Sequence, residues 1–146
     1  MGKKIDSKMH TAEHILNQTM VRLLGCDRCF SAHIETKKSK CDYHFPRPLK
    51  QAEVSEIEGK VNEVIQADLE VSEKYISREE AEKRISLKRL PEGEEKEVRV
   101  VRVGDYDECA CIGPHVAKTS EIGIFRIIST GFENGVLRIR FKLKQE

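Results

Sequence analysis

Two short stretches near opposite ends of the chain restrict its fold more than any other feature: His10-Thr11-Ala12-Glu13-His14 and Cys111-Ile112-Gly113-Pro114-His115. Two histidines four residues apart lie on the same face of a helix, about one turn from each other. A cysteine and a histidine on either side of a Gly-Pro turn can face them from a loop. Because imidazole nitrogens and a thiolate suit zinc, we expect the fold to bring His10, His14, Cys111 and His115 to one zinc ion.

Length and composition favour one folded domain that keeps its cysteines reduced. A chain of 146 residues can bury a sufficient core as a single domain over 1–146. The five cysteines are an odd number and the first residues show no signal-peptide pattern, so a disulfide framework is not expected. No apolar run is long enough to span a bilayer, and we expect a soluble, cytoplasmic protein with no membrane partner. The net charge of +1 gives no global basic field, so any RNA contact would have to be local.

Hydrophobic periodicity predicts an α+β fold in which a long helix packs on a largely antiparallel sheet. The first helix carries both N-terminal histidines, is capped by Asp6 or Ser7 and ends at Gly25. The long helix is expected over 51–69. Strands are expected over 30–35 and 40–45 as a hairpin, over 71–76 and 98–103, and over 122–128 and 136–143 joined at Asn134-Gly135, with a short helix over 77–85.

The first histidine pair is also compatible with a protease motif. His10, Glu13 and His14 have the spacing of the His-x-x-Glu-His signature of inverted zinc metalloproteases, in which the glutamate is the general base. The match is short, the domain is small for a substrate cleft, and Cys111 and His115 would have no role. We therefore favour the four-ligand zinc site, in which Glu13 lies on the helix surface or beside the ligands.

A second, structural zinc site is a further possibility. Cys26 and Cys29 have two residues between them, and Cys41 and His44 have the same spacing. However, Cys41 and His44 fall in an expected strand, where residues three apart point to opposite faces unless a bulge intervenes. Buried or idle thiols beside a helix end are the favoured interpretation.

The ordered motifs resemble one known family. The stretch from His10 to Leu16 resembles the His-Thr-Ala-x-His-Leu-Leu motif of the alanyl-tRNA synthetase editing domain and of its free-standing relatives, the AlaX proteins. The stretch over 111–127 is similar to the family's Cys-x-Gly-x-His-Val segment with its following Thr-x-Glu-Ile-Gly, and 57–65 resembles its long helix. Cys109 stands where related domains often carry an acidic or polar residue, and the Cys-x-Gly-Pro-His form also occurs in the editing domain of threonyl-tRNA synthetases.

The resemblance implies zinc-dependent hydrolysis, in trans, of the ester that joins a wrong amino acid to the 3′ adenosine of a transfer RNA. Zinc could polarise the ester carbonyl, orient the α-amino group, or lower the pKa of a bound water towards about 7, so a zinc-bound water is expected to attack and no side-chain base is assigned. The expected substrates are seryl-tRNA and glycyl-tRNA for alanine. The alternatives are editing of seryl-tRNA for threonine, and a noncatalytic RNA-binding module in which zinc is structural.

Pocket and RNA-contact residues follow from side-chain chemistry. Thr11, Ser31 and His33 could line the amino-acid pocket, although a helix threonine and polar strand residues often have purely structural roles. A pocket that hydrogen-bonds the serine hydroxyl would discriminate better than one that selects by size. The tRNA acceptor end, a single-stranded extension, is the expected partner, bound weakly and in a salt-sensitive way. The candidate contacts are basic: Lys37, Lys38, Lys40, Lys83, Arg84, Lys88, Arg89, Arg138, Arg140 and Lys142.

Overall fold

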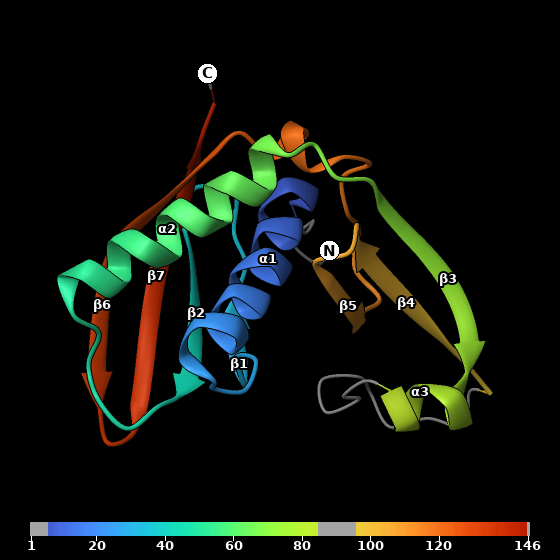
Figure 1. Ribbon diagram of the computed structural model, residues 1–146, viewed down its shortest axis with the longest axis horizontal. Helices are drawn as coiled ribbons and strands as arrows, with labels where there is room; N and C mark the ends of the chain where they lie inside the picture. Colours follow the sequence, from blue (N-terminus) through green and yellow to red (C-terminus); the bar gives the residue numbers. More distant parts are fainter. Residues whose placement is uncertain (1–5, 85–95, 146) are drawn as a thin grey trace.

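The computed structural model describes residues 6–84 and 96–145 and has the expected α+β architecture (Figure 1). The first three elements build one side of the molecule, and the chain then passes through a second helix to a separate group of strands. In chain order the elements are α1 (Ser7–Leu24), β1 (Ser31–His33), β2 (Ser39–His44), α2 (Gln51–Gln66), β3 (Val71–Ser77), α3 (Arg78–Arg84), β4 (Glu97–Val103), β5 (Asp107–Ala110), the 3-10 helix η1 (Thr119–Ile122), β6 (Ile124–Glu133) and β7 (Val136–Lys144).

The strands pair antiparallel, as expected, and they divide between two sheets. One sheet has four strands in the order β1-β2-β7-β6, and the other has three in the order β3-β4-β5. Each strand of the smaller sheet pairs with the next one along the chain, whereas β7 returns from the C-terminal end to pair with β2. Figure 1 shows α1 between the two sheets. Both sheets therefore depend on α1 for their relative placement.

Local capping explains the limits of α1. The side chain of Asp6 accepts a hydrogen bond from the backbone N–H of Met9 at 3.0 Å, as expected for an N-cap. Gly25 has φ of 68°, in the left-handed region, and its N–H bonds to the carbonyl of Val21. The expected start and end of the first helix are thus confirmed.

The second helix is shorter than the sequence predicts. α2 ends at Gln66, because Ala67 caps it and Asp68 adopts φ of 53° and turns the chain away from the helix axis. Leu69, expected inside the helix, instead donates its backbone N–H to Oγ1 of Thr119 at 2.8 Å. Both expected hairpins are present. In the second one, Asn134 and Gly135 have φ of 49° and 77°, as the two-residue turn requires.

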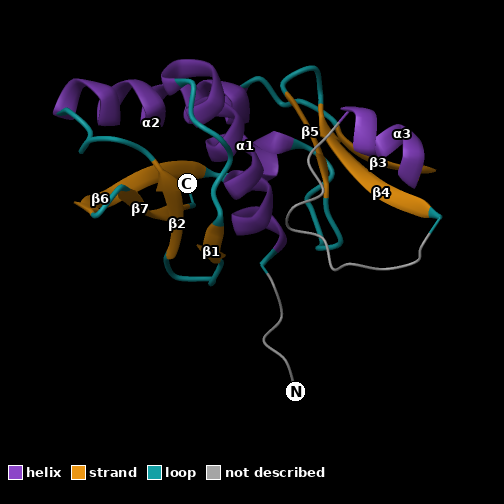
Figure 2. Cartoon of the chain, turned by 90° about the horizontal axis from the view of Figure 1, so that it is seen from below, coloured by secondary structure: helices purple, strands orange, loops and turns teal. Residues whose placement is uncertain are grey.

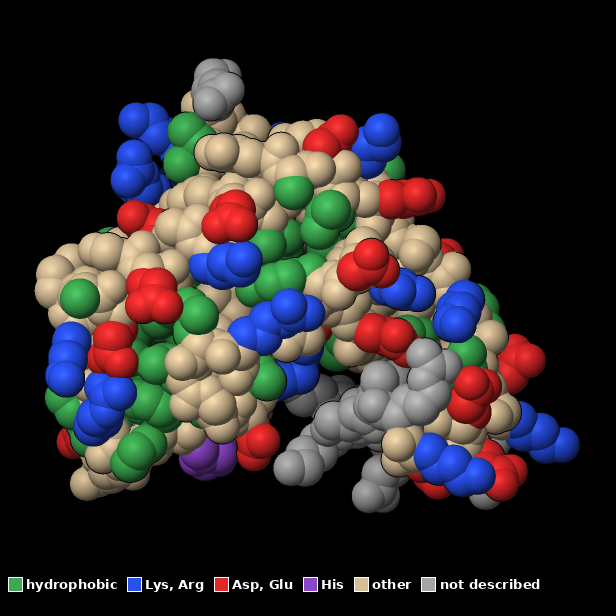
Figure 3. Space-filling view, in the orientation of Figure 1, with side chains coloured by type: hydrophobic (Ala, Val, Ile, Leu, Met, Phe, Trp, Pro, Cys, Tyr) green, Lys and Arg blue, Asp and Glu red, His purple; other side chains and the backbone are tan. Residues whose placement is uncertain are grey.

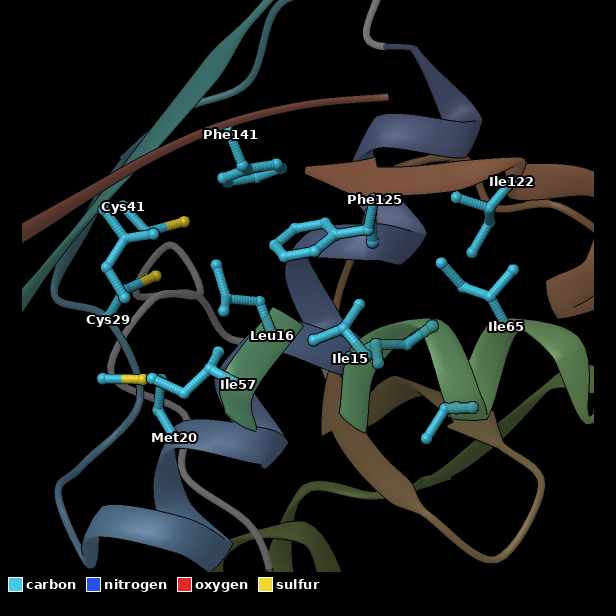
Figure 4. Packing of buried hydrophobic residues seen from close by; sticks show 14 of the residues in the cluster. Ile15, Leu16, Met20, Cys29, Cys41, Ile57, Ile65, Ile122, Phe125 and Phe141 are labelled. Atoms are coloured by element: carbon cyan, nitrogen blue, oxygen red, sulfur yellow. The ribbon is translucent and has the colours of Figure 1, made fainter. Parts of the chain in front are cut away.

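The main core lies between the two long helices and one face of the four-stranded sheet (Figure 2). Phe125 of β6 and Phe141 of β7 lie with their ring centroids 5.2 Å apart, and Figure 4 shows them above Leu16 of α1 and Ile57 of α2. All four side chains are almost completely buried. Burial of each such side chain contributes about 1.5–3 kcal/mol, so this layer fixes α1 on the sheet.

A second, smaller core belongs to the three-stranded sheet and α3. Its buried members are Ile76, Ala81, Val98, Val100 and Ala110. So few apolar side chains stabilise this sheet weakly by themselves, and its packing against α1 through β5 adds to its stability. Within 6–84 and 96–145, no helix is both long enough and apolar enough to cross a membrane.

Candidate metal centre

The fold brings together the four residues that the two motifs predict as zinc ligands. His10 and His14 project from α1, and Cys111 and His115 come from the segment that follows β5. One ligand atom from each residue lies within 4.8 Å of the others, and Nε2 of His10 is 3.3 Å from Sγ of Cys111. Among the described residues, these four side chains form the group that could hold a metal ion. α1 and the segment after β5 thus contribute two ligands each to the candidate site.

Hydrogen bonds to the Nδ1 atoms orient two of the imidazoles. Nδ1 of His10 lies 3.1 Å from the carbonyl oxygen of Pro114, which accepts only if Nδ1 carries the proton. Nδ1 of His115 lies 2.9 Å from Oγ1 of Thr11, whose hydroxyl donates to the carbonyl of Ser7. The Thr11 oxygen therefore accepts from His115. In both imidazoles Nε2 is left for the centre of the cluster.

An unpartnered buried nitrogen supports a metal ion at this place. Nε2 of His115 is buried and has no hydrogen-bond partner among the described residues. With Zn–N of about 2.1 Å and Zn–S of about 2.3 Å, tetrahedral ligand atoms lie about 3.3–3.8 Å apart. The 3.3 Å between His10 and Cys111 agrees with that spacing. The donor set and its geometry therefore fit zinc.

The cysteine of the cluster is prepared for metal binding. Burial raises the pKa of the Cys111 thiol, but the adjacent imidazoles of His10, His115 and His14 outweigh burial and lower the pKa to about 3. Cys111 is therefore a thiolate near neutral pH, the form that binds zinc. Cys109 differs, because burial raises its pKa to about 11 despite the nearby charge of Arg28. The thiol at this position thus stays protonated near neutral pH.

The ligand-bearing turn depends on a glycine and an arginine. A Cβ atom on Gly113 would lie 2.2 Å from Cε1 of His10, so only glycine lets this imidazole approach the turn. Arg99 of β4 donates from Nη1 to the carbonyl of Cys111 at 3.1 Å and to that of Gly113 at 2.7 Å. Glu73 of β3 binds the same guanidinium. The smaller sheet therefore holds the turn in place.

The third imidazole faces a carboxylate that the sequence analysis did not identify. Nδ1 of His14 is 3.6 Å from Oδ2 of Asp107, the first residue of β5. Arg28 grips the same carboxylate at 2.6 and 3.2 Å, and Gln18 donates to it at 3.0 Å. Burial raises the pKa of Asp107, but His14 and Arg28 outweigh this effect and lower it. No spacing pattern links these residues in the sequence, so no signal could have shown their contact.

Comparisons with known proteins point to the same family as the two motifs. Residues 98–140 match the family described as the threonyl and alanyl tRNA synthetase second additional domain. The chain is 36% identical over 133 residues to an alanine–tRNA ligase of Coxiella burnetii, and 35% identical over 137 residues to one of Treponema denticola. An alanine–tRNA ligase of Methanopyrus kandleri is 34% identical over 140 residues.

The chain is related to the alanyl-tRNA synthetases. These alignments cover 89–92% of the chain but only 15–23% of the ligases, so the similarity concerns one segment of much longer proteins. The family match contains Cys111 and His115, and the alignments extend over most of the chain. The resemblance seen in the motifs is thereby confirmed.

In this synthetase relative, Glu13 is buried rather than on the helix surface. Its side chain is 2% exposed, and Oε2 accepts a hydrogen bond from Nδ2 of Asn17 at 3.1 Å and lies 3.7 Å from Sγ of Cys29. Oε1 is 3.9 Å from Nε2 of His10. The surface placement was wrong because this face of α1 packs against the segment before β1. The alternative placement, beside the ligands, is the one observed.

The expected pocket residues are not gathered around the cluster. Thr11 is buried and its hydroxyl holds His115 and the N–H of Val116, which is a positioning contact. Ser31 and His33 flank Ala32 on β1, which pairs with the core-facing Cys41. Alternation along a strand places Ser31 and His33 on the opposite face of the sheet, away from α1. Only Thr11 of the three reaches the metal centre.

The structure does not assemble the second zinc site. Cys41 is fully buried in the main core, whereas His44 is exposed and stacks on Phe30 with 3.9 Å between ring centroids. The two residues point to opposite faces of β2, as the strand pattern predicts. Cys26 lies 3.7 Å from the carbonyl of Met20, and Cys29 lies beside Glu13. The favoured interpretation, thiols without a shared metal, agrees with this arrangement.

Several of the expected RNA-contact residues share the face of the four-stranded sheet that α1 and α2 leave uncovered (Figure 2). Lys40 pairs with Arg140, and Arg138 binds Asp42 through two hydrogen bonds of 2.7 and 2.9 Å. Lys37 and Lys38 are exposed in the turn between β1 and β2. On the face that Figure 3 displays, basic side chains are interspersed with acidic ones. The Arg84 side chain, Lys88 and Arg89 lie outside the part of the structure that is described.

Proposed function

We propose that this chain is a zinc-dependent aminoacyl-tRNA deacylase that hydrolyses the ester of mischarged transfer RNA in trans. The observation that carries the proposal is the cluster of three imidazoles and one cysteine in a relative of the alanyl-tRNA synthetases. The chain spans about a sixth to a quarter of those ligases, so the activity is proposed for this segment alone. A cytoplasmic location accords with a transfer RNA substrate.

The residues of the cluster divide the work between holding the metal and positioning its ligands. His10, His14, Cys111 and His115 would bind zinc, which supplies polarisation of the ester carbonyl or activation of water for attack. The carbonyl of Pro114 and the hydroxyl of Thr11 keep two imidazoles in the correct tautomer. No side-chain general base is assigned, and Cys109, two residues before Cys111, is protonated near neutral pH.

The substrate class follows from the relatives and from the chemistry of discrimination. We propose seryl-tRNA and glycyl-tRNA for alanine as substrates, with seryl-tRNA for threonine as the alternative. A serine hydroxyl is best distinguished by a hydrogen bond, because a pocket that admits serine also admits the smaller alanine. The hydroxyl of Thr11 is already bonded to Ser7, His115 and Val116, so that bond would come from another group.

Transfer RNA is proposed to contact the basic residues locally. Lys37 and Lys38 in the β1–β2 turn, together with Lys40, Arg138 and Arg140 on the uncovered sheet face, are the candidates. The carboxylate of Asp42 neutralises much of the charge of Arg138. Weak, salt-sensitive binding is therefore expected, with affinity that falls as phosphate contacts are screened.

A deacylation assay tests the proposal directly. Purified chain loaded with zinc should hydrolyse seryl-tRNA for alanine faster than correctly charged alanyl-tRNA, and chelation should abolish the difference. His10→Ala is the loss-of-ligand variant, and Lys74→Ala, on β3, is the matched surface control. Equal rates on both substrates, or hydrolysis restricted to seryl-tRNA for threonine, would contradict the assignment to alanine.

A second function is favoured by the ligand count. Four protein ligands ordinarily close a zinc site and make it structural, whereas hydrolysis needs an open position. A noncatalytic RNA-binding module would have this closed site. Zinc-loaded chain that binds transfer RNA but leaves every mischarged ester intact would establish this alternative.

A further inference from the structure

Asp107 is a buried carboxylate that neither the motifs nor the relatives assign to any role. It begins β5, four residues before Cys111, and is 4% exposed. Its Oδ2 atom faces Nδ1 of His14 at 3.6 Å, and this nitrogen has no closer partner among the described residues. A buried imidazole nitrogen and a buried carboxylate oxygen thus point at each other beside the metal cluster.

The Asp107 carboxylate is held rigidly by two other side chains. Arg28, in the segment between α1 and β1, binds it through Nη1 at 2.6 Å and Nη2 at 3.2 Å. Gln18, one turn after His14 on α1, donates to Oδ1 at 3.0 Å. A two-point contact from a planar guanidinium fixes both the position and the plane of a carboxylate. The carboxylate that faces His14 is therefore held in place by Arg28 and Gln18 together.

His14 differs from the other two histidines in the charge of its Nδ1 partner. His10 faces a backbone carbonyl and His115 faces a hydroxyl, and both of these partners are neutral. Among the three Nδ1 atoms, only that of His14 faces a carboxylate. Such a partner fixes the tautomer, orients the ring and raises the basicity of the ligating nitrogen.

We propose that Asp107, clamped by Arg28 and Gln18, is a positioning residue of this centre and holds the Nδ1 proton of His14 so that Nε2 faces the metal. The inference rests on the zinc site proposed above. The clamp also joins three parts of the chain, since His14 belongs to α1, Arg28 to the segment after it and Asp107 to the smaller sheet. Asp107 acts through His14 and touches neither substrate nor metal.

The chain offers a matched control for this role. Asp42 and Arg138 form another two-point carboxylate–guanidinium pair, at 2.7 and 2.9 Å, on the uncovered face of the four-stranded sheet. Asp107→Asn and Asp42→Asn each remove one negative charge from such a pair and keep the size of the side chain. Only the first change weakens the partner of a metal ligand.

Zinc affinity, measured by competition with a chelator of known affinity, tests the proposal. Asp107→Asn should weaken zinc binding about 10-fold to 100-fold, and Asp42→Asn should change it less than threefold. Arg28→Lys, which keeps the charge but loses the two-point grip, should fall between them. Equal zinc affinity in the wild type and Asp107→Asn would overturn the proposal.

A second measurement uses only the wild type, so it tests the proposal even if Asp107→Asn does not fold. Long-range proton–nitrogen NMR on the zinc-loaded wild type should show His14 protonated at Nδ1 and bound to the metal through Nε2. Binding through Nδ1 would overturn the proposal. Failure of the proposed function is distinguishable, because a wild type that binds zinc through these atoms without hydrolysing any ester leaves the role of Asp107 intact.

Discussion

At the scale of single residues, Gly113 is a position beside the candidate metal ligands where a side chain would collide with His10. Gly113→Ala would place a methyl group 2.2 Å from the imidazole, so either the ring or the turn must move. We expect zinc affinity to fall at least about 10-fold, as for loss of a ligand-orienting contact. Chelator competition and thermal unfolding with zinc present measure the effect.

Gly59 provides the control for this substitution. It lies inside α2 and a Cβ atom there would meet nothing within 4 Å. Gly59→Ala should leave zinc affinity unchanged and stabilise the fold by about 0.5–1 kcal/mol, because alanine favours a helix interior. If Gly113→Ala also keeps full zinc affinity, the turn is more adaptable than its geometry indicates.

The prediction for Glu13 separates the deacylase from a protease. Glu13→Gln keeps an oxygen that can accept the hydrogen bond from Asn17, so the buried contact survives without the charge. We expect deacylation to fall less than about 10-fold, whereas loss of a general base costs about 10²-fold to 10⁴-fold. Deacylation rates, peptidase assays and zinc content are the measurements. Near-complete loss of hydrolysis with zinc content unchanged would identify Glu13 as the base.

The state of Cys111 in the metal-free protein can be tested by its pH dependence. Because the fold lowers the pKa of this thiol from its ordinary value of 9.0 to about 3, the thiol should already be ionised at pH 6. This ionisation stabilises the metal-free fold most above pH 9, and its contribution is lost as the pH falls to about 3. Thiolate absorbance of chelated protein at pH 6 should disappear in Cys111→Ser. Absorbance that appears only above pH 8 would contradict the prediction.

At the scale of elements, the β1–β2 turn is the proposed place of RNA contact. Replacing Lys37 and Lys38 together by glutamate reverses two exposed charges and should raise the KM for mischarged tRNA several-fold, with little change in kcat. The difference should shrink as salt is added. Lys74→Glu on β3 is the control. An unchanged KM would move the RNA contact to another surface.

The elements themselves were largely predictable because their signals are local. Asp6 and Gly25 mark the limits of α1 through capping, and Asn134-Gly135 fixes the β6–β7 hairpin through positive φ. The end of α2 was misplaced because Leu69 continues the helical spacing of apolar residues. Its actual position is decided by the hydrogen bond to Thr119, a residue distant in the sequence.

At the scale of the whole molecule, the metal centre joins α1 to the segment after the smaller sheet. A ligand that binds only the folded state stabilises it by about 2.7 kcal/mol at a hundred times its dissociation constant. Zinc removal should therefore lower Tm and speed hydrogen exchange most in β3, β4 and β5, whose own core is small. Thermal unfolding and exchange mass spectrometry with and without chelator provide the test. Uniform exchange in both states would show that the smaller sheet does not depend on the metal.

The sequence by itself determined the chemistry of the centre. His10 and His14 share a face because a helix repeats every 3.6 residues, and Cys111 and His115 flank a turn that Gly113 and Pro114 specify. Thiolate and imidazole ligands suit zinc better than magnesium or calcium. These inferences needed only periodicity and ligand type, which are properties of short stretches.

Only the tertiary structure decided which groups surround those ligands. The division into two sheets, the burial of Glu13 and the contact of Asp107 with His14 all depend on packing between distant segments. Thr11 matched a motif, yet its hydroxyl orients His115 because the ligand turn folds back onto α1. The chemistry of Ser31 and His33 suits a pocket, but the pairing of β1 with β2 places both on the other face of the sheet. Pairing and burial are set by the free energy of the whole core, to which no single stretch of sequence gives access.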